Sequence, residues 1–318
     1  MLNNENQQAI DALKDVAMAG IKEQRSSRRW SIFFKFATLI LLFLLIMAVV
    51  GSAMSKSTRM SAAPSYTAVV DVQGVILQGA EASADNIIPA LQDAFADKKV
   101  KGIILRCNSP GGSPVQSSYV YNEIKRLRGI YKDKKVIAVA ADLCASGGYF
   151  IISAADEIYA NPSSLVGSIG VRMQSFGVVE AMKKIGVENR ELTAGENKAI
   201  LDPFSPRKPE DEAFVKDLLA TTHKHFIDAV KAGRGDRLKN DPDIFSGLFW
   251  TGEDAKALGL IDDFGSPASV ARDVIGAETM VNFSPEKDIF ERLSKRIGAS
   301  VTKLLLESNN SPAPVLYK

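Results

Sequence analysis

The sequence is poor in the residues that most often bind metals or hold small domains together. Its 318 residues include only two cysteines, Cys107 and Cys144, and two histidines, His223 and His225. A zinc cluster and a disulfide scaffold both need more of these residues, so both are excluded. We expect no metal and no other cofactor, and any chemistry must come from other side chains.

Neither sign of charge dominates the sequence. The 39 basic residues nearly balance the 37 acidic ones, which leaves a formal net charge of +2. This balance excludes a polybasic protein, so no nucleic-acid partner is expected. Hydrophobic residues make up 46% of the chain, which is too many for a disordered protein.

The longest uncharged segment covers residues 36–55. As a helix it would span about 30 Å, the thickness of the hydrocarbon core of a bilayer, so we predict one transmembrane helix. Five basic residues precede it and two follow it: Lys22, Arg25, Arg28, Arg29 and Lys35, then Lys56 and Arg59. This bias predicts a cytoplasmic leader at residues 1–35 and export of the remainder. A cleaved signal peptide is the alternative, and the length of the apolar run argues against it.

The remainder of the chain divides into three parts. Residues 56–64 are rich in serine and alanine, which is typical of a linker. A globular domain is predicted at residues 65–280. Residues 281–318 are predicted to form an amphipathic C-terminal helix, because apolar residues recur at every fourth position, followed by a flexible tail.

Short β-branched runs alternate with helical segments in the globular domain. Strands are predicted at 66–76, 101–107, 134–141 and 187–192, and helices at 84–98, 115–131, 146–155, 210–232, 252–258 and 267–275. A strand–helix–strand order predicts parallel pairing through right-handed crossovers. Strands that are apolar on both faces predict an α/β fold, with the sheet covered on both sides.

Two glycine-rich loops follow neighbouring predicted strands, where ligands gather in parallel sheets. Residues 108–113 read NSPGGS, and residues 142–149 read DLCASGGY, with Ser146 at a predicted helix start. Together these loops offer a hydroxyl group and several free backbone N–H groups to one anionic site. The simpler interpretation is that Ser146 only caps the helix.

A serine nucleophile needs a base, and the composition limits the candidates. His223 and His225 lie on a charged helix, where solvent exposure is the expected outcome, so a Ser-His-Asp triad is not favoured. Lysine is the remaining candidate, provided that its amine is neutral. Lys198 differs from the clustered surface lysines because it follows a glycine and precedes an apolar triplet.

These motifs together resemble the signal peptide peptidase A family, whose members are membrane-anchored serine–lysine peptidases. The similarity covers residues 65–275. It rests on NSPGG at 108–112, ASGGY at 145–149, VGSIGV at 166–171, the glycine, lysine and DPF of 195–204, and WTGEDAKALGLIDDFG at 250–265. The resemblance implies a ClpP/crotonase-like spiral of parallel strands and helices. The single copy resembles the short form of the family.

The resemblance also implies a role for each matching residue. Ser146 would be the nucleophile, Lys198 the general base, and Ser168 the residue that hydrogen-bonds the lysine amine. The N–H groups of Gly112 and Gly147 would form the oxyanion hole. A homo-oligomer is implied, a dome-shaped ring such as an octamer, in which neighbouring subunits supply the serine and the lysine.

The implied function is a serine endopeptidase in the bacterial inner membrane, with its catalytic domain outside the cytoplasm. Its substrates would be remnant signal peptides and other apolar, unfolded peptides. Two alternatives stay open: a crotonase-like acyl-thioester enzyme, and a membrane-tethered scaffold that binds peptides without cutting them. For Cys107 and Cys144, buried thiols are favoured, and a disulfide between these strand-end neighbours stays open.

Overall fold

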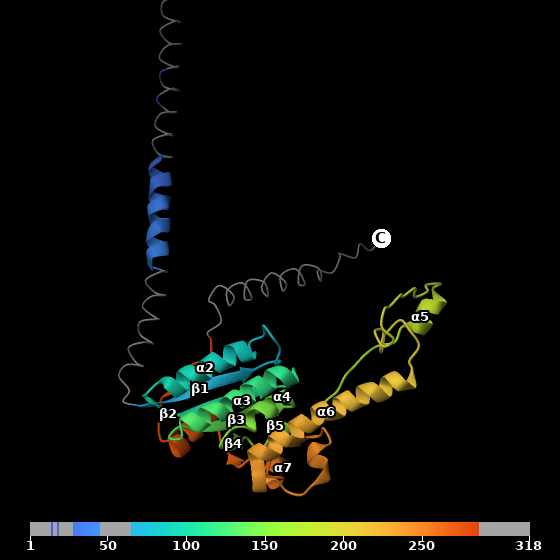
Figure 1. The fold of residues 1–318 in the computed structure, drawn as a ribbon. Helices are drawn as coiled ribbons and strands as arrows, with labels where there is room; N and C mark the ends of the chain where they lie inside the picture. The colour runs from blue at the N-terminus through green and yellow to red at the C-terminus, as the bar shows by residue number, and fades with distance from the viewer. Residues whose placement is uncertain (1–13, 15–17, 19–27, 45–64, 286–318) are drawn as a thin grey trace, which may run out of the picture. The chain divides into compact units, whose positions relative to one another are not determined.

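The computed structural model (Figure 1) describes residues 14, 18, 28–44 and 65–285. Two compact units make up the chain, Met1–Ala63 and Pro64–Lys318. Most of the predicted leader, the linker and the C-terminal residues from 286 lie outside the described residues. The second part of the predicted membrane segment, from residue 45, also lies outside them.

A helix occupies residues 28–44 of the first unit. Its large apolar side chains are exposed, among them Phe33, Leu39 and Leu41. Within the described residues, no helix combines the length and the apolar character that a membrane crossing needs. The membrane anchor therefore stays a prediction from the sequence.

Three long parallel strands with helices between them form the centre of the second unit (Figure 1). β1 (Tyr66–Gln73), β2 (Val100–Ser109) and β3 (Lys135–Ala145) pair side by side. α2 (Ala84–Ala96) connects β1 to β2, and α3 (Pro114–Ile130) connects β2 to β3. The predicted alternation of strand and helix is therefore confirmed. Each helix is the crossover that two parallel neighbouring strands need.

The sheet continues on both sides of these strands, in the order β6-β5-β3-β2-β1-β8. β3 has two partners along its outer side: residues 137–140 pair with β4, and residues 143–145 pair with β5. All pairs are parallel except β5 with β6. The short strands are β4 (Glu157–Ala160), β5 (Leu165–Gly167), β6 (Phe249–Thr251), β7 (Asp263–Phe264) and β8 (Met280–Asn282). This mixed, mostly parallel sheet agrees with an α/β fold of the ClpP/crotonase type.

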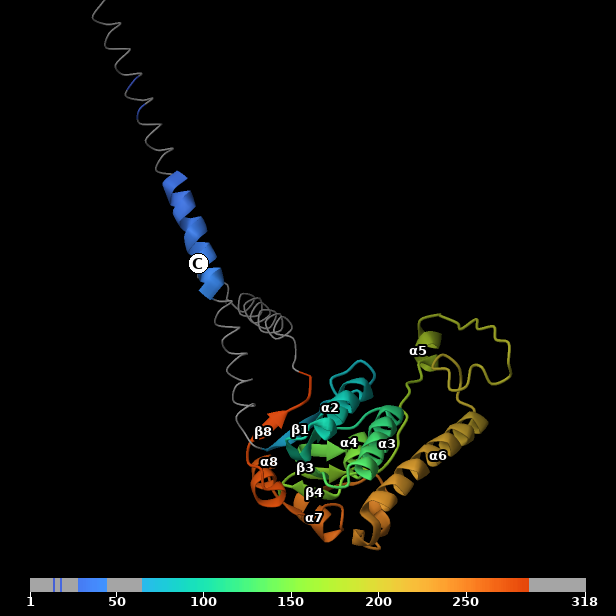
Figure 2. The same cartoon turned by 60° about the vertical axis from the view of Figure 1, so that its left-hand side comes forward.

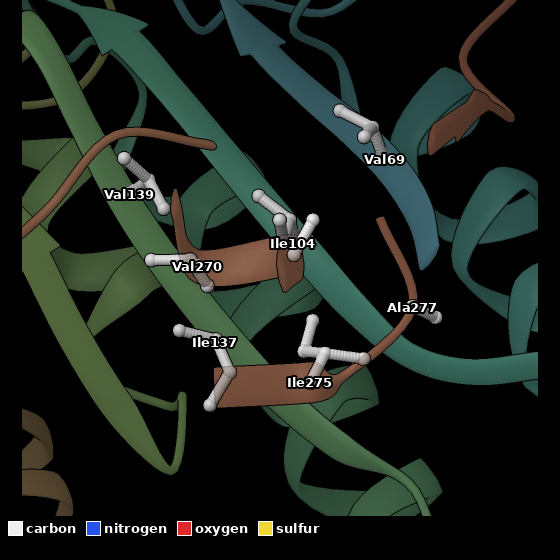
Figure 3. Close-up of a cluster of buried hydrophobic side chains, with 8 residues drawn as sticks. Val69, Ile104, Ile137, Val139, Val270, Ile275 and Ala277 are labelled. Carbon is white, nitrogen blue, oxygen red and sulfur yellow. The ribbon is translucent and has the colours of Figure 1, made fainter. Parts of the chain in front are cut away.

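An apolar cluster closes one face of the sheet (Figure 3). It joins side chains of β1, β2 and β3 to the segment formed by α8 (Pro267–Ser269) and the π-helical turn η3 (Val270–Ile275). The members are Val69, Ile104, Ile137, Val139, Val270, Ala271, Ile275 and Ala277. The predicted helix at 267–275 therefore serves as the cover of this face.

The remaining helical segments include three that the sequence predicts, at 146–155, 210–232 and 252–258, and three that it does not predict. They are α4 (Gly147–Ile152), α5 (Val179–Lys184), α6 (Pro209–Arg234), α7 (Gly252–Ala257) and the 3-10 turns η1 (Gly235–Arg237) and η2 (Pro242–Phe245). The prediction of a strand at 187–192 is wrong. These residues have no regular structure and pair with no other strand.

Residues 187–192 belong to a longer segment, residues 171–208, which we call the arm. The arm projects from the sheet together with the first half of α6 (Figures 1 and 2). None of the arm residues is buried. Its exposed apolar side chains include Met173, Phe176, Ile185, Val187, Leu192 and Phe204. Within the described residues, the arm therefore has no buried core of its own.

Candidate active site

The loop after β2 and the loop after β3 lie against each other at the carboxyl ends of their strands. A β-carbon placed on Gly111, where φ is +95°, would lie 2.6 Å from Cβ of Ser146 and 2.7 Å from the amide nitrogen of Gly147. No other residue fits in that space without displacing backbone atoms. The paired glycines of the first loop are thus what bring it into contact with Ser146.

Ser146 precedes the first turn of α4, with φ at 52° and ψ at −123°. Non-glycine residues rarely adopt a positive φ, and those that do gather at functional sites. The N–H of Ser146 donates to the carbonyl oxygen of Gly167 at 2.8 Å, which holds this backbone in place. Its hydroxyl does not cap the helix, so the interpretation of Ser146 as an ordinary N-cap is wrong.

The amides of Gly112 and Gly147 lie close together beside Ser146. A β-carbon on Gly147 would lie 3.2 Å from the amide nitrogen of Gly112 and 2.5 Å from Oγ of Ser117. Gly147 is the first residue of its helix, where N–H groups have no intrahelical acceptor. Within the described residues, neither amide donates a hydrogen bond. Such a pair can hold a developing negative charge on an oxygen atom.

Ser168 lies on the same cavity as Ser146. It follows β5, also has a positive φ of 52°, and its N–H donates to the carbonyl oxygen of Leu248 at 2.7 Å. The cavity measures about 1200 Å³, and Ser146, Ser168, Gly112 and Gly147 all line it. The structure therefore brings together four of the five residues that the sequence predicts for the site.

Lys198 is the predicted site residue that the structure leaves apart. It lies in a turn of the arm, where its N–H donates to the carbonyl oxygen of Gly195 at 3.1 Å, and its side chain is exposed. Lys198 does not line the cavity that contains Ser146. A single chain thus presents a nucleophile candidate without the predicted base.

An aromatic cluster forms one wall of the cavity, and sequence reasoning missed it. The ring of Phe150 packs edge-on against Tyr121, with 5.4 Å between centroids, and lies tilted by 31° against Phe226, with 5.0 Å between centroids. These rings come from α4, α3 and α6, so no local pattern links them. A cavity with this wall can accept apolar side chains of a peptide.

The two histidines also lie closer to the site than the sequence suggests. His223 is half-buried, and its Nε2 atom lies 3.0 Å from the carbonyl oxygen of Ile169, next to Ser168. His225 is exposed but lines the cavity. The expectation of plain solvent exposure is therefore wrong for His223. Within the described residues, neither histidine forms a hydrogen bond with Ser146, so no Ser-His-Asp triad is formed there.

Cys107 and Cys144 form a disulfide, with 5.6 Å between their Cα atoms. Both are fully buried. The preference for free thiols is therefore wrong, and the pairing that the sequence left open is present. Such bonds persist in oxidising compartments.

A buried charge network lies behind α4. Arg234 is 1% exposed and donates to both carboxylate oxygens of Asp262, at 2.7 and 3.0 Å. Burial by itself raises the pKa of Asp262, but the hydrogen bonds and charge of Arg234 outweigh it and keep that pKa below its ordinary value. Tyr149 of α4 donates to the carbonyl oxygen of Leu260 at 2.7 Å, and its burial raises its pKa. These contacts hold α4 in place.

Comparisons with known proteins show similarity to peptidases. The model of peptidase family S49 matches residues 130–275, a range that contains Ser146, Ser168 and Lys198. Protease 4 of Haemophilus influenzae is 36% identical over 212 residues, which are 64% of this chain and 33% of that protein. The chloroplastic serine protease SPPA of Arabidopsis thaliana is 32% identical over 188 residues, which are 59% of this chain and 27% of that protein.

A Brucella abortus protein named Na(+)/H(+) antiporter NhaA is 44% identical over 246 residues. The match covers 76% of this chain and 33% of that protein. The chain spans about a third of the length of the curated relatives described here. Residues 130–275 match peptidase family S49, which agrees with the resemblance identified from the motifs.

Proposed function

We propose that the protein is a serine endopeptidase in which Ser146 is the nucleophile. One observation carries the proposal: a serine with strained backbone lies beside two amides that donate no hydrogen bond to any described residue, on a cavity with an aromatic wall. The role of the amides of Gly112 and Gly147 is to stabilise the oxyanion, and each such donor contributes about 100- to 1,000-fold to turnover.

Lys198 is the proposed general base, and it reaches Ser146 from a second copy of the chain. Two observations support this arrangement. The arm carries Lys198 outside the cavity of its own chain, and the arm also exposes apolar side chains that a second copy would cover. Ser168 lines the same cavity as Ser146, and its proposed role is to accept a hydrogen bond from the incoming amine. A closed ring of identical subunits would complete every site in this way.

The proposed reaction proceeds through an acyl-enzyme. The neutral amine of Lys198 accepts the proton of the Ser146 hydroxyl while Oγ forms a bond to the peptide carbonyl carbon. The tetrahedral intermediate then collapses, the C–N bond breaks, and the ammonium group returns the proton to the leaving amine. A water molecule next gives a proton to Lys198 while its oxygen bonds to the ester carbon. The C–Oγ bond then breaks, the ammonium group returns the proton to Oγ, and the acid product leaves with both side chains restored.

The proposed substrates are remnant signal peptides and other apolar, unfolded peptides at the outer face of the cytoplasmic membrane. The aromatic wall of the cavity suits apolar side chains. The Cys107–Cys144 disulfide favours an oxidising compartment, as expected for a domain exported behind a membrane segment at residues 36–55.

The first test is labelling and mutation of the full-length protein. We expect an activated phosphonate to modify Ser146, and we expect Ser146→Ala and Lys198→Ala each to lower turnover at least about 1,000-fold. Lys184→Ala is the matched control, because Lys184 is another exposed lysine of the arm, and it should keep full activity. Full turnover by Ser146→Ala, with binding of an acyl thioester, would instead support the crotonase-like alternative.

Mixed assemblies test whether two chains share each site. Ser146→Ala and Lys198→Ala subunits, dissociated and reassembled in equal amounts, should regain up to about a quarter of wild-type turnover, since that share of sites receives both intact side chains. If the mixture stays as inactive as its components after verified exchange of subunits, Lys198 does not act across an interface.

A further inference from the structure

The two site loops begin where the pairing of β2 with β3 is interrupted. The parallel register is regular up to Cys107 opposite Ala140 and resumes only with Ser109 opposite Cys144. Two steps along β2 therefore correspond to four along β3. The regular ladder of backbone hydrogen bonds does not by itself fix this end of the strand pair.

The disulfide crosses this interruption. Cys107 is the last residue in regular register on β2, and Cys144 is the first residue to pair again on β3. The other link across the gap is Asn108, whose amide donates to Asp142 and accepts from the N–H of Leu143, both at 3.3 Å. These two hydrogen bonds are long, so the covalent bond is the firm connection.

The disulfide also supports the helix that carries the nucleophile candidate. A β-carbon on Gly148, in the first turn of α4, would lie 3.2 Å from Sγ of Cys107 and 3.3 Å from Cβ of Ser109. Ser109 in turn accepts from the N–H of Gly111 through its Oγ at 3.1 Å. The disulfide thus lies next to both loops. Cys144 is two residues from Ser146 in the sequence, and Cys107 is five residues from Gly112.

We propose that the Cys107–Cys144 disulfide is a positioning element for the two oxyanion amides, and that it makes the site redox-sensitive. The dithiol form, present before export, leaves the loops free to separate and is poorly active. Formation of the bond removes two electrons and two protons from the thiols. A thiol–disulfide oxidant of the exported compartment accepts them and becomes a dithiol. The inference rests on the proposed role of Ser146.

The expected effect follows from the tolerance of catalytic geometry. A displacement of about 1 Å lowers a rate about 100-fold, and an oxyanion donor contributes about 100- to 1,000-fold. Reduction should therefore lower the rate of phosphonate labelling of Ser146 and kcat by about 10- to 100-fold, with a much smaller change in KM. A loss of structure would instead lower the fraction of protein that binds peptide.

The experiment compares two forms of the full-length protein that contain the same side chains. One form is purified under oxidising conditions and the other under reducing conditions, and peptide mapping after alkylation assigns the thiols. We expect linked Cys107 and Cys144 peptides in the first form and alkylated thiols in the second. Reoxidation should restore labelling, which a misfolded protein would not do. The double variant Cys107→Ala/Cys144→Ala should resemble the reduced form and should not respond to reoxidation.

Hydrogen exchange separates this inference from the proposed function. On reduction, the amides of residues 108–113 and 145–149 should exchange at least about tenfold faster, while those of the far ends of β1 and β2 should not change. Equal exchange and equal labelling in both forms would overturn the positioning role, as would free thiols in the oxidised form. Faster exchange without labelling of Ser146 in either form would keep the positioning role and reject the proposed nucleophile.

Discussion

At the scale of single residues, the site depends on backbone conformations that few residues adopt. Ser146 and Ser168 both have φ at 52°, and each donates its N–H to a backbone carbonyl oxygen, the first to that of Gly167 and the second to that of Leu248. These hydrogen bonds offset conformations that cost about 1–3 kcal/mol each. Such a cost is consistent with selection for a particular direction of each hydroxyl rather than for stability.

Gly111 offers the sharpest test at this scale. Gly111→Ala places a β-carbon within 2.6 Å of Cβ of Ser146, at a φ of +95°. We expect a loss of about 1–3 kcal/mol in the free energy of unfolding, and a fall in kcat of about 100-fold because the two loops are forced apart. Denaturant unfolding and peptide turnover measure the two effects.

The matched control for that substitution is Gly129→Ala. Gly129 lies near the end of α3, and a β-carbon there would meet no atom within 4 Å. Alanine in a helix is favoured over glycine by about 0.5–1 kcal/mol, so this variant should be slightly stabilised and fully active. A Gly111→Ala protein that behaves like the Gly129→Ala protein would show that the close approach of the loops is not needed.

At the scale of elements, one carboxylate joins α6 to the sheet. Asp262 accepts both hydrogen bonds of Arg234 at the end of α6, and it also accepts from the N–H of Ile158 in β4 at 2.7 Å. Arg234 is nearly inaccessible and donates further to the carbonyl oxygen of Gly259 at 2.9 Å. These hydrogen bonds fix the C-terminal half of α6. They thereby also fix Phe226, which forms part of the cavity wall.

Removing this carboxylate should cost more than removing an exposed one. Asp262→Ala leaves a buried guanidinium without its partner, so we expect a loss of about 3–5 kcal/mol in the free energy of unfolding. Asp228→Ala breaks the exposed pair with Lys224 on the same helix and should cost at most about 1 kcal/mol. Equal losses in the two variants would contradict the role assigned to Asp262.

The same carboxylate predicts a pH dependence of stability. The folded pKa of Asp262 is lowered, so its contribution is complete above the ordinary pKa of an unfolded aspartate, about 3.9, and is lost as the pH falls through the folded value. Asp262→Asn removes this titration. The difference in unfolding free energy between wild type and Asp262→Asn should therefore shrink as the pH falls below about 4, and a constant difference would reject the assignment.

The sequence predicts the elements whose signals are local. The runs in β1, β2 and β3 are apolar and β-branched, and the glycine-rich loops after two of them are visible as motifs, so these strands and the positions of Ser146, Gly112 and Gly147 follow directly. Residues 187–192 show why this approach fails elsewhere. Their composition permits a strand, but a strand needs a partner, and the arm offers no edge with which to pair.

Other features could not be predicted because they depend on tertiary register. The pairing of Cys107 with Cys144 requires the interruption between β2 and β3, which no pattern in the sequence marks. The aromatic wall of the cavity combines rings from three separate helices. The sequence context and the family motif both point to Lys198, but its separation from the cavity of Ser146 could not be predicted, because it depends on where the arm lies.

At the scale of the whole molecule, the arm is the feature that a single chain leaves unexplained. Leu192 is 99% exposed, Ile185 is 74% exposed and Phe176 is 73% exposed. Exposed apolar surface of this kind is typical of interaction sites. The proposed assembly covers the arm and delivers Lys198 to a neighbouring cavity at the same time, so the arm should matter for association and activity but not for the fold.

Substitution on the arm therefore separates folding from assembly. Phe176→Ser/Leu192→Ser should shift the protein from its oligomer toward smaller species in sedimentation velocity, and should lower turnover about 100-fold or more, because buried aromatic and aliphatic anchors carry most of the energy of an interface. Ile130→Ser is the matched control, since Ile130 is 58% exposed at the end of α3, away from the arm. Because neither set of side chains is buried in the single chain, thermal midpoints measured at low protein concentration should change by no more than about 2 °C in both variants. An unchanged sedimentation profile for the arm variant would exclude the arm as the contact between subunits, and Lys198 would then need another route to Ser146.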